Sequence, residues 1–133
     1  MTRTSFGFAI ALFALASGAV RAEGLDASKP LRCSISEAAE CDGVAACKDV
    51  TLEQIDLPPL WRVDFAAKQL ASEDGQRTSP IAALETLDDA LVLQGVQSGR
   101  GWTLVVERAT GHLSGSAADA EGAFVLAGSC TAE

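Results

Sequence analysis

The sequence predicts an all-β fold: an antiparallel meander that closes into a small barrel or half-barrel of about six to eight strands, braced by disulfides. Two observations predict it. From residue 60 onward, short apolar runs alternate with turn signals at even spacing, which is typical of small β-sheet proteins. The chain also has four cysteines, and an even number of cysteines in a short exported chain predicts disulfides.

The N-terminus has the pattern of a secretory signal peptide, which we place at residues 1–22. The basic residue Arg3 precedes an apolar run from Phe6 to Val20, and small residues stand three and one before a cut after Ala22. The run is too short for a good membrane span, so we expect no membrane insertion of the mature protein. The remainder, residues 23–133, is long enough for a single β domain with one modest core.

The amino-acid composition limits which classes of partner and which cellular compartment are expected. Once Arg3 and Arg21 are removed with the signal peptide, eight basic residues face eighteen acidic ones, a net charge of −10. This acidic charge disfavours nucleic acid and anionic membranes and permits a cationic protein partner. The chain is rich in Ala and Gly and has neither Asn nor Tyr, a bias typical of GC-rich bacterial genomes. We therefore predict localisation in the periplasm.

The pairing of the cysteines is predicted from strand alternation, because spacing alone leaves three pairings open. Alternation in "LRCSI" and "FVLAGSC" puts Cys33 and Cys130 on apolar faces that point into the core. Cys41 and Cys47 bracket the short loop "DGVAA". We therefore predict the bridges Cys33–Cys130 and Cys41–Cys47. The cysteine gaps and the single, distant His112 do not match zinc-ligand spacing, so we predict no metal and no cofactor.

The bridge between the first and last strands is expected to bring the ends of the meander together. Turns are expected at "SEDGQ", "LDDAL", "SGRG", "ATG" and "DAEG". Residues 79–91 also fit a helix that begins at Ser79 and Pro80, but the even spacing of the turns favours strand. We expect residues 23–30 to be a frayed tail and residues 42–59 a loop. Trp61 and Trp102 lie on apolar strand faces and are interpreted as core, so we expect a filled interior.

Catalytic motifs are sparse. Ser114 or Ser116, His112 and Glu107 can be combined into a Ser-His-acid set, yet no G-x-S-x-G motif accompanies them. No calcium-binding or phosphate-binding loop is present in the sequence. We therefore predict that the protein is not an enzyme.

The segments "LRCSISEAAEC", "LWRVDFAAKQL" and "VLQGVQSGRGWTLVVERATGHLSGSAADAEGAFVLAGSC" carry a resemblance. Together they are similar to small exported proteobacterial β proteins of uncharacterised function, and this resemblance implies a fold but no catalytic residue. The chain also faintly resembles periplasmic inhibitors of c-type lysozyme, which present a Ser-Gly loop to a basic enzyme. Ser98 and Gly99 match that loop, whereas Arg100 and the missing Tyr depart from it, with Trp102 as the nearest aromatic residue.

Together these observations predict an exported, non-enzymatic binding or accessory protein, with inhibitor-like action as one form of it. It would present the loops 98–101 and 42–48 to a partner. The candidate binding residues are Ser98, Gly99, Arg100, Gly101 and Trp102. Two alternatives stay open: a small hydrolase that uses Ser114 or Ser116 with His112, and a carrier of a small apolar ligand between Trp61 and Trp102.

Overall fold

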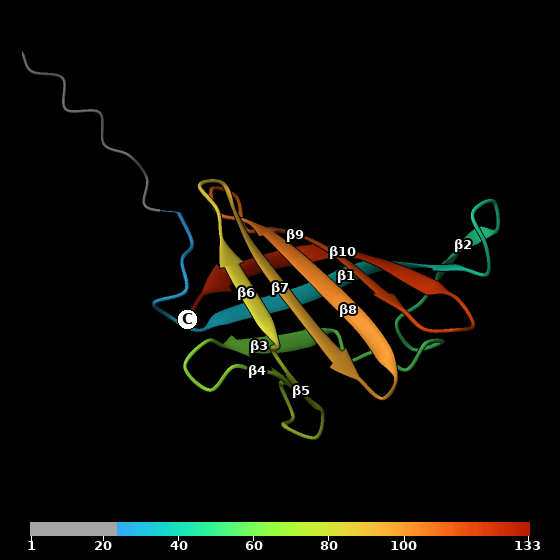
Figure 1. Cartoon of the computed structure of the whole chain (residues 1–133), viewed down its shortest axis with the longest axis horizontal. Coiled ribbons are helices and arrows are strands. Elements are labelled where there is room, and N and C mark those ends of the chain that lie inside the picture. The colour runs from blue at the N-terminus through green and yellow to red at the C-terminus, as the bar shows by residue number, and fades with distance from the viewer. Residues whose placement is uncertain (1–23) are drawn as a thin grey trace, which may run out of the picture.

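The computed structural model describes residues 24–133, and these residues form an antiparallel sheet of ten strands without a helix (Figure 1). The predicted signal peptide lies outside the described residues. The all-β prediction is confirmed. The strands are β1 (Leu31–Cys41), β2 (Cys47–Val50), β3 (Leu60–Asp64), β4 (Gln69–Ser72), β5 (Thr78–Pro80), β6 (Ala83–Thr86), β7 (Ala90–Gln97), β8 (Arg100–Glu107), β9 (His112–Ala118) and β10 (Ala123–Ala132).

Nine of these strands form a half-barrel in the order β5-β4-β3-β1-β10-β9-β8-β7-β6, and β2 pairs with β1 outside this path. Only residues 81 and 82 separate β5, which pairs with β4, from β6, which pairs with β7. The amide of Ile81 donates to Lys68 O (2.9 Å) and the amide of Ala82 donates to Gln94 O (2.8 Å). The segment 78–86 therefore connects the two edges of the sheet.

This connection also decides between strand and helix for residues 79–91, where strand was favoured. The segment consists of β5, β6 and the start of β7, so the strand prediction is confirmed. Its helix-like apolar spacing has a different origin: Ile81 and Leu91 are buried, whereas Leu84 and Leu87 are exposed. β5 pairs with β4, whereas β6 pairs with β7. Because the pairing partner changes, the alternation of inward and outward side chains is interrupted between these two strands.

The two predicted disulfides are both present, Cys33–Cys130 and Cys41–Cys47. In each case the two cysteines are direct cross-strand neighbours, the first pair between β1 and β10 and the second between β1 and β2. Strand alternation predicted the first pair correctly, since both of its cysteines are buried in the core. The bridge fixes the first strand of the meander to the last.

One end of the half-barrel is closed by the N-terminal segment, so the expectation of a frayed tail over residues 23–30 is wrong for the described part, 24–30. Leu25 donates its amide to Arg108 O (2.8 Å), and the Arg108 guanidinium donates back to Leu25 O (2.7 Å). The same guanidinium also donates to Leu87 O (3.0 Å). Below this cover lie the fully buried side chains Leu31, Val63, Leu91, Leu93, Val106 and Leu113.

The expectation of a loop over residues 42–59 is wrong for residues 47–50, which form β2. Register places Cys47 opposite Cys41, so the chain returns along β1 as an antiparallel strand. The hairpin protrudes from the body of the sheet (Figure 1), and Val44 in its turn is fully exposed. Beyond β2, Leu52, Ile55 and Leu57 pack against the core.

Candidate functional site

A cavity of about 510 Å³ occupies the inside of the half-barrel. It opens between the β4–β5 and β7–β8 turns. These turns lie at one end of the half-barrel, and residues 24–30 cover the other end. The expectation of a filled interior is therefore wrong for this end of the half-barrel, whereas fully buried side chains fill the covered end. The apolar part of the wall consists of Cys33, Ile35, Leu57, Trp61, Val63, Leu70, Trp102, Leu104, Leu113, Ala117 and Leu126.

Glycine explains why large side chains leave this space open. A Cβ atom on Gly95 would lie 2.4 Å from Cζ2 of Trp102, so the indole ring packs directly against the backbone of β7. A Cβ atom on Gly115 would similarly lie 2.8 Å from Cδ2 of Leu104. Both side chains fit against the wall because the facing residue has no side chain. Space remains in the centre of the half-barrel as a result.

The two tryptophans are fixed as walls by hydrogen bonds at their edges. Trp61 Nε1 donates to Pro58 O (2.7 Å), and Trp102 Nε1 donates to the Ser79 hydroxyl (2.8 Å). Buried indole N–H groups normally need such partners. Because both donors are satisfied, the rings offer the cavity apolar surface only.

The mouth of the cavity is polar and comes from two turns. On one side, Gln76 and Arg77 belong to the β4–β5 turn and Thr78 begins β5. On the other side, Ser98 belongs to the β7–β8 turn, and Gln97 and Arg100 are the strand residues that flank this turn. Ser98 and Gly99 both have positive φ, 51° and 77°, as a tight two-residue hairpin of type I′ requires. Of the predicted binding residues, Ser98, Arg100 and Trp102 line the cavity, and Gly99 and Gly101 do not.

Each arginine at the mouth is paired with an aspartate. Arg100 donates through Nη2 (2.7 Å) and Nε (3.1 Å) to Asp119 Oδ2, and its guanidinium lies 4.9 Å from the centre of the Phe124 ring. Arg77 forms an ion pair with Asp56. The hydrogen bond from Arg100 lowers the pKa of Asp119, and the backbone amides of Glu121 and Gly122 lower it further. The charges of both arginines are thus balanced locally.

We predict that Asp119→Asn lowers stability at pH 7 and that this loss shrinks in acid. Asn keeps an acceptor for the turn amides but has no charge for Arg100. Because the pKa of Asp119 is lower in the folded state, its contribution is complete above the unfolded pKa of about 4 and disappears as pH falls through the folded pKa. Urea unfolding of both proteins at pH 7 and pH 3 measures this. An equal difference at both pH values would contradict the ion pair.

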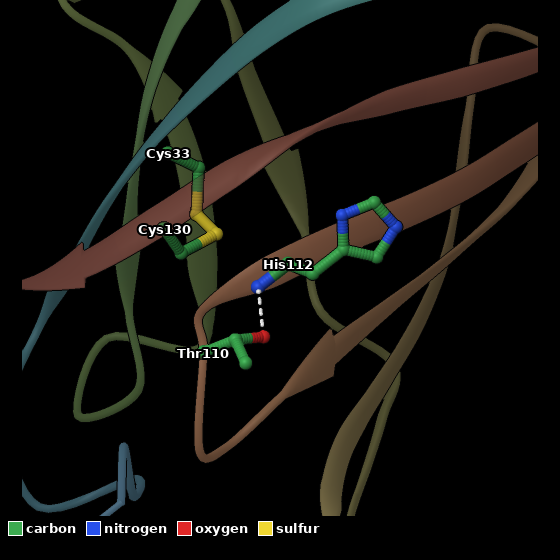
Figure 2. Close-up of a disulfide and its surroundings, with 4 residues drawn as sticks. All are labelled: Cys33, Thr110, His112 and Cys130. Atoms are coloured by element: carbon green, nitrogen blue, oxygen red, sulfur yellow. Dashed lines mark hydrogen bonds between the residues drawn. A yellow bond between two sulfur atoms is a disulfide. The ribbon is translucent and has the colours of Figure 1, made fainter.

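Of the candidate hydrolase residues, His112, Ser114 and Glu107 lie outside the cavity. Ser114 Oγ is 3.4 Å from His112 Nε2, so the structure brings this pair together, and both residues are exposed on β9. The His112 ring points away from the Cys33–Cys130 bridge, and its backbone amide donates to Thr110 Oγ1 (3.1 Å; Figure 2). Glu107 instead accepts from Thr110. Within residues 24–133, no carboxylate is hydrogen-bonded to the His112 side chain.

The second predicted binding loop and the predicted Asp88–Asp89 turn lie away from the cavity. Residues 42–48 belong to the β1–β2 hairpin and do not line it, whereas Ser116 does. Asp88 and Asp89 lie at the turn between β6 and β7, as expected. In the described part of the chain, no group of three or more His, Cys, Asp and Glu side chains is placed to hold a metal ion. The same residues include no helix with the length and apolar character of a membrane span.

Comparisons with protein-family models, with curated proteins and with solved structures gave no match.

Proposed function

We propose that the mature chain is an exported, non-enzymatic binding protein that holds a small apolar ligand inside the half-barrel. The observation that carries this proposal is the cavity of about 510 Å³ between Trp61 and Trp102. Its volume falls in the range of about 300–1,000 Å³ that small-molecule sites occupy. Of the functions considered from the sequence, the carrier of a small apolar ligand agrees best with this geometry.

The chemistry of the wall supports an apolar ligand. A ligand would contact leucine, isoleucine and valine side chains and two aromatic rings whose N–H groups already have acceptors. An apolar molecule therefore leaves neither indole N–H unpaired when it displaces water. Each methylene that it buries contributes about 0.8 kcal/mol. Binding would be driven mainly by the hydrophobic effect.

Within residues 24–133, His112 and Ser114 have no carboxylate that orients the histidine, which supports the non-enzymatic part of the proposal. A serine nucleophile needs a histidine that is oriented by a third group, and Glu107 is engaged by Thr110 instead.

Export to the periplasm is supported by the predicted signal peptide and by the two disulfides, because disulfides persist in oxidising compartments. The resemblance to small exported proteobacterial proteins agrees with this location, and the acidic charge suits a cationic protein partner outside the cavity.

We predict that Ala117→Phe blocks the site. Ala117 lines the cavity and is the cross-strand neighbour of Trp102, so a phenyl ring there would occupy the space offered to a ligand. The neutral fluorescent probe N-phenyl-1-naphthylamine should bind the natural protein, quench its tryptophan emission and gain fluorescence. Ala117→Phe should weaken this binding about tenfold or more, which corresponds to about 1.4 kcal/mol.

Ala118→Phe is the matched control. Ala118 is the next residue on β9, is exposed and does not line the cavity, so the same phenyl ring lies outside the half-barrel. Probe affinity should stay within about twofold of the natural protein. If the natural protein bound no probe, or if both variants lost binding equally, the cavity would not be the ligand site.

A further inference from the structure

We infer that the ligand is an uncharged amphiphile, whose apolar chain fills the cavity and whose single hydrogen-bonding group, such as an alcohol, stays at the mouth. This inference rests on the proposed function and adds the chemical class of the ligand. Three observations support it. The cavity is closed at one end, the charged side chains at its mouth are already paired with one another, and uncharged polar side chains at the mouth remain without a partner among the described residues.

The direction of entry follows from the two ends of the half-barrel. Cys33, Val63 and Leu113 are buried side chains at the inner end of the cavity. Beyond them the core is fully buried, and residues 24–30 cover that end through the contacts of Leu25 with Arg108. A ligand therefore enters between the β4–β5 and β7–β8 turns. Its apolar part goes inward, and its polar part remains among the residues of these turns.

The charges at the mouth disfavour an ionic head group. The guanidinium of Arg100 holds Asp119 with two donors, and Arg77 is paired with Asp56. An anionic head would meet two guanidiniums whose charges the carboxylates already compensate. A cationic head would need a carboxylate that its arginine already neutralises. Among the described residues, neither kind of ion therefore finds an uncompensated opposite charge at the mouth to offset the hydration that its head group would lose there.

The remaining polar side chains suit a neutral group. Gln76, Thr78, Gln97 and Ser98 line the cavity, and none of their side chains has a hydrogen bond to another described residue. A carboxamide both donates and accepts, as does a hydroxyl. An alcohol, which also donates and accepts, matches them without a change in charge.

Three ligands with ten-carbon skeletons test the inference: decan-1-ol below its solubility limit, and decanoate and decyltrimethylammonium below their micelle-forming concentrations, all at pH 8. Each is titrated against the full mature protein loaded with N-phenyl-1-naphthylamine, and displacement of the probe is measured. Decan-1-ol should displace the probe at a concentration at least tenfold lower than either ion. Octan-1-ol should be about tenfold weaker than decan-1-ol, because each methylene changes affinity roughly three- to fourfold.

The outcomes separate the inference from the function on which it rests. Probe binding with a clear preference for decan-1-ol supports both. Probe binding with equal or tighter binding of decanoate or of the ammonium ion overturns the inference and leaves the proposed function standing. No probe binding overturns the proposed function itself. Ala117→Phe, titrated in parallel, should bind the probe about tenfold or more weakly and show a correspondingly smaller displacement signal, which assigns the signal to the cavity.

Discussion

Replacing Cys33 and Cys130 together by alanine should lower the free energy of unfolding by about 4–5 kcal/mol. The bridge joins residues 97 positions apart, and the chain-entropy model gives about 4.7 kcal/mol for a loop of roughly 100 residues. A domain of this size has a total stability of about 5–15 kcal/mol, so the variant should be close to unfolding at 37 °C. Urea titration followed by tryptophan fluorescence gives the value.

Replacing Cys41 and Cys47 by alanine is the matched control for this experiment. That bridge spans only 6 positions and holds the exposed β1–β2 hairpin. The same model gives about 2 kcal/mol for so short a loop. Equal losses for the two double variants would contradict an entropic role for the longer bridge. The Cys33 variant should also bind the probe more weakly, because Cys33 lines the cavity and lies opposite Trp61.

The fold could be predicted because its strongest signals are local. Alternation of apolar and polar residues identifies the inward face of a strand, and it put Cys33 and Cys130 on the inner faces of strands that proved to be neighbours. Turn signals such as Asp74–Gly75 and Ser98–Gly99 mark where strands reverse. Gly75 has the positive φ that its turn requires. Neither signal depends on knowing which strands pair.

What could not be predicted depends on contacts between distant residues. Leu25 is fixed by Arg108, which lies 83 positions away, and nothing in the local sequence of residues 23–30 indicates that partner. The strand β2 is short and exposed, and it exists because register sets Cys47 opposite Cys41. Its own side chains carry no alternation that would have identified it.

The candidate site was predicted in part for the same reason. Ser98, Arg100 and Trp102 were identified because they belong to one continuous hairpin. Gln76 and Arg77 were missed, because the closure of the half-barrel brings their turn to the same mouth. A filled interior was preferred to a cavity between Trp61 and Trp102 because alternation reports which face a side chain occupies and not how much volume it fills. The missing information was the register that sets Gly95 opposite Trp102.

That register makes Gly95→Ala the most informative single substitution in the cavity wall. The new methyl carbon would lie 2.4 Å from Cζ2 of Trp102 and 2.5 Å from the Pro80 carbonyl oxygen. Pro80 has little room to withdraw, because it ends β5 and is paired with Gln69 of β4. The Trp102 ring must therefore move inward, off the wall and into the cavity. Overpacking of this kind costs about 3 kcal/mol.

Gly101→Ala separates this effect from the general cost of adding a methyl group to a strand. Gly101 is the neighbour of Trp102 on β8, and a Cβ atom there meets no other atom within 4 Å. Its unfolding free energy should stay within about 0.5 kcal/mol of the natural protein. Gly95→Ala should instead lose stability, change the near-ultraviolet circular dichroism of Trp102 and bind the neutral probe less tightly. If Gly95→Ala kept its stability but lost the probe, Trp102 would have moved without strain, and the wall would be more adaptable than its packing against Gly95 indicates.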